Sequence, residues 1–149
     1  MQVIPFLPEH GLQVVDNAVE VISGWDNGKV IQEYYEGGPA FTGLNDAGEI
    51  VGCAGIVVVG SGVGSAWAIV DKDKVHTVPT PEIYGAIRHH LPLLMKQYGF
   101  RRVQADCVAG IPVLERFATN AGFTKEGILR KFGRNGEDHV FFSLVEGDI

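Results

Sequence analysis

The segment from Thr80 to Phe123 constrains the fold of this chain more than any other part of it. Its apolar pattern predicts a long helix over Pro81–Tyr98, a buried strand over Arg102–Val108 and a short helix over Pro112–Asn120. A strand followed by a helix and a further strand can return to the same sheet in parallel orientation. We therefore expect one β-α-β crossover, which leads into this segment from the strand that precedes it.

Start and stop signals agree with this division. Thr80 is a good N-cap, and Pro81 stands at the first helical position, where proline is favoured. Gly99 directly follows the long helix and Gly122 lies two residues after the short one, at positions where a left-handed residue that closes a helix is usually glycine. Pro92 lies inside the long helix and should kink it, because proline removes one backbone hydrogen bond.

The remaining elements are predicted on both sides of this segment. On the N-terminal side we expect, in order, a strand, two helices and three strands: Gln2–Phe6, Glu9–Ser23, Lys29–Glu36, Ala40–Asn45, Glu49–Val59 and Ser65–Val70. On the C-terminal side Lys125–Phe132 and His139–Val145 should form a hairpin around Asn135-Gly136. Antiparallel hairpins flank the single crossover, so the expected class is α+β, with a mixed β-sheet of about seven strands and about four helices.

Two groups of apolar residues are predicted to be core. One group lines a single face of the long helix: Ile83, Ile87, Leu91, Leu94, Met95 and Tyr98. The other belongs to the short helix and the residue that follows its cap: Leu114, Phe117 and Phe123.

Composition and charge bound the possible functions. With 149 residues, 46% of them hydrophobic, residues 1–149 should form a single domain. The net charge of -6 argues against a nucleic-acid partner, because phosphate binding needs clustered Lys and Arg. Glycines interrupt the longest apolar stretch, Ile50–Val70, so no membrane span is expected. The N-terminus lacks the pattern of a signal peptide, and Cys53 and Cys107 fit buried thiols, which favours the cytoplasm. No Cys/His spacing suggests a metal site.

Two short motifs, together with the order of the predicted helices and strands, resemble those of a known family. They are Tyr98-Gly99-Phe100 before the fifth strand and Phe117-Ala118-Thr119-Asn120-Ala121-Gly122-Phe123 at the end of the fourth helix. With them the chain resembles the GNAT N-acetyltransferase superfamily along nearly its whole length. It is also similar to small phage-encoded GNAT-like proteins, which share its length and a fourth strand with a tryptophan before an Asp-rich, glycine-poor loop.

The resemblance implies an acyl-CoA-dependent N-acetyltransferase with acetyl-CoA as its cofactor. In that family the fourth and fifth strands splay apart, and the pantetheine arm pairs with the end of the fourth strand. The cofactor diphosphate lies on a loop that corresponds to Asp71–Pro81 here, which contains no glycine and two prolines. The implied cofactor-binding residues are the strand end and the polar side chains of this loop: Ala68, Ile69, Val70, Lys72, Lys74, Thr77 and Thr80.

The chain departs from the family at two further positions. Ile111 and Ala118 stand where many members carry an asparagine and the tyrosine that protonates the departing thiolate. Together with the loop, these departures leave an alternative open. In that alternative the chain is a catalytically silent GNAT-like structural or interaction protein, for example in a virion.

Candidate catalytic residues follow from the chemistry of amine acylation, which needs a base. Asp106 on the fifth strand is one candidate, and a merely solvated carboxylate is its alternative. His76, in the predicted cofactor loop, is the other, because histidine titrates near neutral pH, although a loop histidine is often just exposed.

The acceptor is expected to be a small-molecule or peptide amine. An aromatic rim from Trp25, Tyr34, Tyr35 and Phe41 would suit it, although the two tyrosines could instead pack a helix on the sheet. The acidic residues Asp26, Glu33 and Glu36 favour a cationic acceptor. The oligomeric state is left open, with a homodimer as one alternative.

Overall fold

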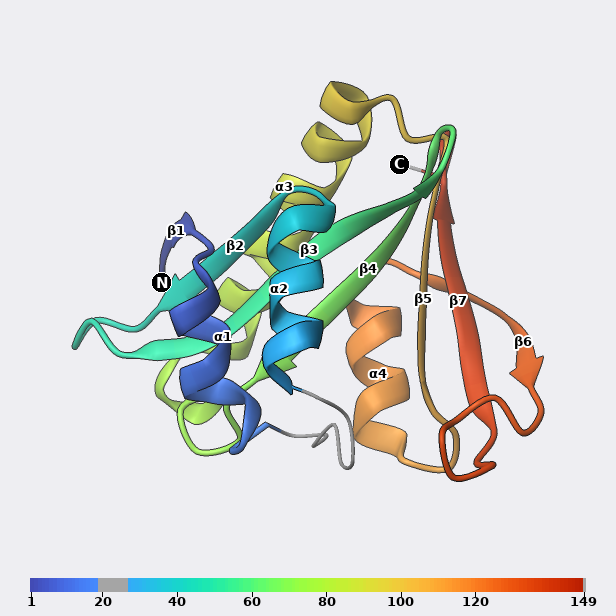
Figure 1. The fold of residues 1–149 in the computed structure, drawn as a ribbon. Coiled ribbons are helices and arrows are strands. Elements are labelled where there is room, and N and C mark those ends of the chain that lie inside the picture. Colours follow the sequence, from blue (N-terminus) through green and yellow to red (C-terminus); the bar gives the residue numbers. More distant parts are fainter. Residues whose placement is uncertain (19–26, 149) are drawn as a thin grey trace. The chain divides into compact units, whose positions relative to one another are not determined.

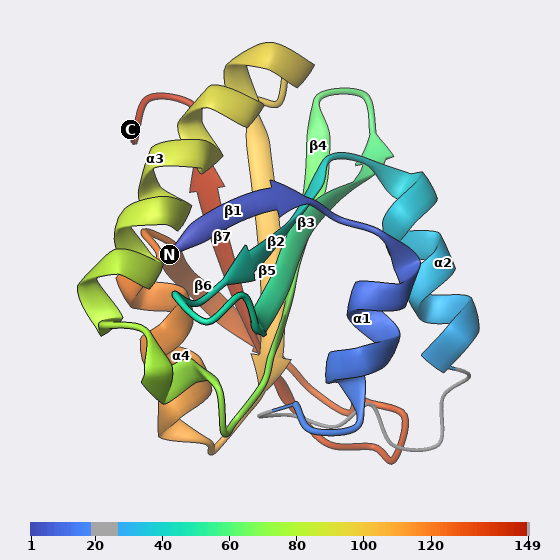
Figure 2. The same cartoon turned by 90° about the vertical axis from the view of Figure 1, so that its left-hand side faces the viewer.

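The computed structural model of the chain describes residues 1–18 and 27–148, which contain four α-helices, a 3₁₀ turn and a seven-stranded sheet (Figures 1 and 2). The strand order is β1-β2-β3-β4-β5-β7-β6; β4 and β5 are parallel, whereas the pairs β1–β2, β2–β3, β5–β7 and β6–β7 are antiparallel. The elements are β1 Gln2–Pro5, α1 Pro8–Val15, α2 Asn27–Gly37, β2 Ala40–Leu44, β3 Ile50–Gly60, β4 Val63–Val70, η1 Val75–Thr77, α3 Thr80–Tyr98, β5 Arg102–Val108, α4 Pro112–Asn120, β6 Thr124–Leu129 and β7 His139–Val145. The predicted α+β class and mixed sheet are confirmed.

The chain divides into two compact units. The first unit contains residues 1–58 and 66–83, and the second contains residues 59–65 and 84–149. The boundaries cut through β3, β4 and α3, so each unit takes part of the same strands and of one helix. The expectation of a single domain over residues 1–149 stays a prediction.

The central segment has the boundaries that its sequence signals predict. The predicted ranges of β5, α4 and β7 are reproduced, and α3 begins one residue earlier, at Thr80. Gly99 and Gly122 have φ angles of 68° and 107°, which is the left-handed conformation expected after the two helices. Pro92 lies inside α3, which continues on both sides of it.

Two predictions about element length were wrong, and one short element was not predicted. The helix predicted over Glu9–Ser23 ends at Val15, because Asp16 closes it and Asn17 N–H turns back to the Val14 carbonyl. The last residues of that prediction lie outside the described residues. The strand predicted to reach Phe132 ends at Leu129, and the short turn η1 was not anticipated.

The first unit has its core beneath α1 and α2, which lie side by side (Figure 2). Its buried residues come from both helices, the first strand region, β3 and β4: Phe6, Val14, Val15, Ala18, Ile31, Cys53 and Ile69. Gly11 permits this contact, because a Cβ atom there would lie 2.7 Å from Ile31 Cδ1. Leu12, on the same helix, is 49% exposed.

The second unit is built on β5, which pairs with β7 in antiparallel orientation from Arg102↔Val145 to Val108↔His139 (Figure 1). Its most deeply buried residues are Val103, Val140 and Phe142. Of the predicted core, Leu91, Met95 and Phe123 are buried, and five others are half-buried: Ile83, Ile87, Leu94, Leu114 and Phe117. The prediction for Tyr98 was wrong, since its side chain is 48% exposed and stacks on the Phe100 ring at 6.1 Å.

The parallel contact between β4 and β5 is short. Its register contains Val63↔Arg102, Gly64↔Val103 and Ser65↔Gln104. Both strands continue beyond these pairs, β4 to Val70 and β5 to Val108. The predicted adjacency of the two strands is confirmed, and the ladder ends several residues before either strand does.

Neither cysteine forms a disulfide. Cys53 is 3% exposed, and burial raises the pKa of its thiol to about 11. Cys107 is half-buried on β5.

The burial of Cys53 predicts a strong difference in thiol reactivity. At pH 8 the native Cys53 thiol should be ionised in only about one molecule in a thousand, and the thiolate is the reactive form. We expect Cys107→Ser, which retains Cys53 alone, to react with a disulfide reagent at least about tenfold more slowly when native than in denaturant. Comparable rates in the two states would contradict the burial of this side chain.

Candidate functional site

The loop that follows β4 is built around the side chain of Asp71. One carboxylate oxygen, Oδ1, accepts the backbone N–H groups of Asp73 and Lys74 at 2.9 and 3.0 Å. The same oxygen accepts Nδ2 of Asn17 at 2.8 Å, and that amide also reaches Asp73 Oδ2 at 2.9 Å. The Asp71 carboxylate therefore holds the backbone N–H groups of Asp73 and Lys74 and the side-chain amide of Asn17.

Four other backbone N–H groups of the loop are used internally as well. Each donates to a backbone carbonyl of the first unit at 2.9 to 3.5 Å. Lys72 donates to Asn17, Val75 to Asp71, Thr77 to Lys74 and Val78 to Val75. Pro79 and Pro81 have no N–H to offer. An anion that takes one of these N–H groups would have to displace a hydrogen bond that is already made.

The polar side chains of residues 71–77 are also engaged, with two exceptions. Lys74 Nζ forms an ion pair with Glu49 Oε2. Thr77 Oγ1 donates to the Lys74 carbonyl at 2.6 Å and accepts Nδ2 of Asn45 at 2.9 Å. Lys72 and His76 are exposed, and no ion pair to either is found among the described residues.

The Glu49–Lys74 pair has a consequence for stability that depends on pH. The Lys74 ammonium, with help from the Asn45 amide, lowers the pKa of Glu49 below its usual value of 4.5. A carboxyl group whose pKa is lower in the folded state stabilises the fold above its unfolded pKa and loses this contribution as the pH falls. The contribution should therefore disappear below about pH 4.5.

We expect Glu49→Gln to make the unfolding midpoint in urea less dependent on pH between 6 and 3 than in the wild type. The matched control is Glu33→Gln, at an exposed position on α2. The control should keep the wild-type pH dependence, and equal slopes for all three proteins would contradict the prediction.

Most of the predicted site residues belong to the first unit. Ala68, Ile69 and Val70 end β4, where Ile69 is buried in the core and Ala68 is exposed. Lys72, Lys74, His76 and Thr77 belong to the loop, and Thr80 is the exposed first residue of α3. Asp106 is the exception, because it lies in the second unit.

The backbone N–H groups of residues 72–75 offer no free site to the diphosphate of acetyl-CoA. Diphosphate sites need several uncommitted N–H groups or cations, because each phosphate oxygen seeks donors. Here the donors of Asp73 and Lys74 are held by Asp71, and the Lys74 ammonium is held by Glu49. The cation role predicted for Lys74 and the hydroxyl role predicted for Thr77 therefore have internal partners instead.

Asp106 is paired with a residue that the sequence reasoning missed. Its Oδ2 lies 2.6 Å from Nδ1 of His139, which begins β7. The Phe132 ring stacks on the imidazole at a centroid distance of 5.2 Å. Since a carboxylate only accepts, Nδ1 must carry the proton and donate it to Asp106. The imidazole thus fixes one oxygen of this carboxylate and leaves Oδ1 as the oxygen that a substrate proton could reach.

The opposite nitrogen of His139 is enclosed. Nε2 is buried without a hydrogen-bond partner among the described residues, and the nearest carboxylate oxygen, Oε1 of Glu137, is 3.7 Å away. Glu137 has a lowered pKa, chiefly through its own backbone N–H and also through the N–H of Asn135 and through His139. Because Nε2 is covered, His139 positions Asp106 and does not itself reach a substrate.

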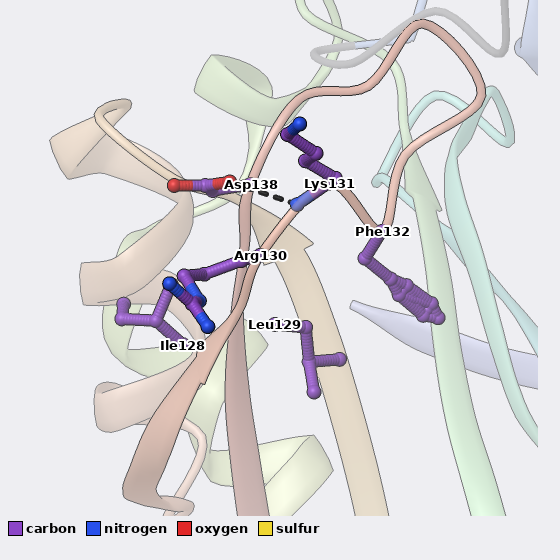
Figure 3. Close-up of a pocket in the computed structure, with 6 residues that line it drawn as sticks. All are labelled: Ile128, Leu129, Arg130, Lys131, Phe132 and Asp138. Carbon is purple, nitrogen blue, oxygen red and sulfur yellow. Dashed lines mark hydrogen bonds between the residues drawn. The ribbon is translucent and has the colours of Figure 1, made fainter.

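A hollow lies on the hairpin that follows β6 (Figure 3). It is lined by Ile128, Leu129, Arg130, Lys131, Phe132 and Asp138. Lys131 has a φ of 55°, and its N–H donates to Asp138 Oδ1 at 2.9 Å. In Figure 3 the side chains of Arg130 and Phe132 point in different directions from the strand, so they do not converge on one ligand.

The predicted aromatic rim is only partly exposed. Tyr34 stacks on Trp67 with nearly parallel rings 4.2 Å apart, and Phe6 meets Trp67 edge-on at 5.2 Å. Tyr34 therefore packs α2 on the sheet, which is the alternative that the sequence left open. Tyr35 is 44% exposed on the same helix as Glu33 and Glu36. Trp25 and Asp26 lie outside the described residues.

Comparisons with known proteins agree with this architecture. The sequence matches no model of a protein family and no curated protein sequence. A mutant of spermidine N-acetyltransferase from Vibrio cholerae has a similar structure, with a TM-score of 0.73 and 12% identity over 97% of this chain and 95% of that one. The ribosomal-protein-S18-alanine N-acetyltransferase from Escherichia coli gives a TM-score of 0.72 and 15% identity over 97% and 92%.

A third similar structure is a ribosomal-protein-alanine N-acetyltransferase from Brucella melitensis, with a TM-score of 0.73 and 13% identity over 98% of this chain and all of that one. These structures define the class of fold, which is that of the GNAT N-acetyltransferases, as the sequence predicted. The likeness to phage-encoded proteins stays a prediction.

The described residues contain neither a membrane-spanning helix nor a cluster of side chains that could hold a metal ion. Within residues 1–18 and 27–148, no helix combines the length and apolar character that a membrane crossing requires. In the same ranges no group of three or more His, Cys, Asp or Glu side chains could hold a metal ion.

Proposed function

We propose that this protein transfers an acyl group from a thioester to an amine. The observation that carries the proposal is the short ladder between β4 and β5. It ends at Ser65 and Gln104, so residues 66–70 of β4 lie outside it. A strand edge outside a ladder can bind the amide groups of an extended ligand through its backbone. The likeness of the fold to N-acetyltransferases supports the same conclusion.

Asp106 is the proposed base. The reaction forms a C–N bond and breaks a C–S bond, the amine nitrogen loses a proton, and the departing thiolate takes one up. His139 holds Oδ2 of Asp106, which leaves Oδ1 to accept the proton from the amine. Ala118 has no phenol, so the proton for the thiolate comes from another group or from water. Acetyl-CoA, where it serves, supplies the thioester.

The proposed acceptor is a cationic amine, either a small molecule or a peptide N-terminus. Glu33 and Glu36 are exposed on α2 beside Tyr35, and the chain carries a net charge of -6. Both favour a positively charged partner by simple attraction. Spermidine, named for one structural neighbour, and an alanine N-terminus, named for others, are the first acceptors to test.

The test is a transfer assay with purified protein. Acetyl-CoA and a simple acetyl thioester are each offered with spermidine and with a peptide that begins with alanine, and acetylated amine is measured by mass spectrometry. We expect acetylated product with at least one acceptor, above the rate without protein. No product with any pair of thioester and amine would overturn the proposal.

A specific observation favours a second candidate, a catalytically silent GNAT-like interaction or structural protein. The loop after β4 is closed upon itself, and Ala118 stands where the phenol of related enzymes would be. This candidate predicts no thermal shift with millimolar acetyl-CoA or simple thioesters. A shift accompanied by product formation rejects it.

Location and assembly belong to the same proposal. A cytoplasmic setting suits two cysteines that form no disulfide. Monomer and homodimer are the two alternatives for assembly, and sedimentation of the purified protein distinguishes them.

A further inference from the structure

We propose that the thioester donor of this protein is of the pantetheine type and lacks the phosphorylated ADP portion of coenzyme A. The inference rests on the acyl transfer proposed above and names the donor class for the same reaction. It follows from three features of the first unit: the committed donors of the loop, its charge, and the strand end that precedes it.

The N–H groups of Asp73 and Lys74 are already bound to the Asp71 carboxylate. A diphosphate that took the N–H groups of Asp73 and Lys74 would have to expel the Asp71 carboxylate from both, and from the Asn17 amide. Breaking these bonds leaves a carboxylate without its partners directly beside the incoming anion. Hydrogen bonds to charged groups are costly to lose, so this exchange is unfavourable.

The charges of the loop disfavour phosphate binding. Asp71 and Asp73 are both in the loop, and Lys74 is already paired with Glu49. Lys72 is the remaining lysine of the loop, and its side chain is exposed, where attraction is weak and screened by salt. Coenzyme A carries three phosphate groups, whereas pantetheine itself is uncharged, so only the former meets this repulsion.

The pantetheine part of the donor could bind at the end of β4 through its amide groups. Pantetheine is an extended chain with two amide groups, which bind to a strand edge through backbone hydrogen bonds. Residues 66–70 of β4 lie beyond the ladder to β5, and Ala68 among them is small and exposed. The end of β4 thus retains what a pantetheine arm needs, while the loop after it lacks what the nucleotide needs.

The experiment compares donors that differ only in the nucleotide. Acetyl-CoA and acetyl-pantetheine are tested with one amine acceptor, and 3′,5′-ADP is added as a competitor. We expect kcat/KM for acetyl-CoA to be about two- to threefold lower than that for acetyl-pantetheine, because the phosphates of the nucleotide are repelled by the loop. We also expect no inhibition and no thermal shift from millimolar 3′,5′-ADP.

The opposite results would overturn the inference. They are a kcat/KM for acetyl-CoA that equals or exceeds that for acetyl-pantetheine, or competitive inhibition by 3′,5′-ADP. Either would leave the proposed acyl transfer intact, since product would still form. Absence of product with both donors would instead overturn the proposed function, and the inference with it.

Two variants test the role of the Asp71 carboxylate. Asp71→Asn keeps an oxygen that can accept the N–H groups of Asp73 and Lys74, but it removes the negative charge. We expect it to shift the ratio of kcat/KM toward acetyl-CoA by about two- to threefold, because repulsion of the phosphates falls. Asp46→Asn, the same change in a hairpin turn outside the loop, should leave the ratio unchanged. An unchanged ratio in Asp71→Asn would contradict this account.

A final arm separates two sources of the donor. Pantetheine thioesters occur as free small molecules and as phosphopantetheine arms attached to a carrier protein. An acetylated carrier protein is therefore compared with free acetyl-pantetheine at equal concentration. Faster transfer from the carrier identifies the protein-bound source, and faster transfer from the free thioester identifies the small molecule. Either order supports the shared chemistry, provided that acetyl-CoA does not exceed both.

Discussion

Gly38→Ala is expected to destabilise the protein by about 3 kcal/mol or more, because the new methyl group has no room to move. A Cβ atom at this position would lie 2.0 Å from the carbonyl oxygen of Ile56 and 3.2 Å from its carbonyl carbon. Ile56 N–H donates to the Pro39 carbonyl at 2.9 Å, which holds the two segments together. The clash is with backbone, so a change of side-chain rotamer cannot relieve it. Urea unfolding followed by far-ultraviolet circular dichroism measures the loss.

The matched control is Gly85→Ala in α3. No atom lies within 4 Å of a Cβ placed there, and the position is exposed in a helix. Alanine forms helix more readily than glycine, so this change should stabilise the protein by about 0.5–1 kcal/mol. A Gly38→Ala protein whose stability lies within about 1 kcal/mol of the wild type would contradict the packing described here.

The fold was predictable where its signals are local. Gly99 and Gly122 follow their helices, and a proline follows Thr80, so the boundaries of α3, β5 and α4 could be read within a few residues of each signal. The hairpin turns were readable for the same reason. The end of α1 was not, since apolar spacing continued past Val15 although the chain turns at Asp16.

The candidate site depends on pairs that are distant in the sequence, and these were not predictable. Asp106 and His139 are 33 residues apart, and they meet because His139 faces Val108, two residues from Asp106, in the register of β5 and β7. Period-two alternation on neighbouring strands could have suggested this pair only after the register was known. The stacking of Tyr34 on Trp67 also joins residues that are distant in the sequence, so it was not predictable either.

The loop after β4 is an intermediate case. Its lack of glycine and its two prolines already argued against a diphosphate site. An aspartate that accepts the N–H groups two and three residues later is a common turn, so the Asp71 contacts were accessible to sequence reasoning. The contacts of this loop with Asn17, Asn45 and Glu49 were not, because they depend on the tertiary structure of the first unit.

The second large effect is expected for Asp106→Asn, which should lower kcat/KM for acyl transfer by about 10²-fold if Asp106 is the base. The asparagine retains an oxygen that can accept the Nδ1 proton of His139, so the fold should persist. It cannot accept a proton from the amine. Steady-state rates over pH 6 to 9 measure the loss, and far-ultraviolet circular dichroism checks the fold.

Three further variants decide how this loss is interpreted. Glu146→Gln makes the same chemical change at an exposed position of the second unit and should keep wild-type activity. His139→Gln removes the group that positions Asp106, so it should lower the rate less than Asp106→Asn does and should change the pH profile. His76→Gln tests the other candidate base, which lies in the first unit. A full rate in Asp106→Asn together with a large loss in His76→Gln would transfer the role of base to the histidine and remove Asp106 from the proposed reaction.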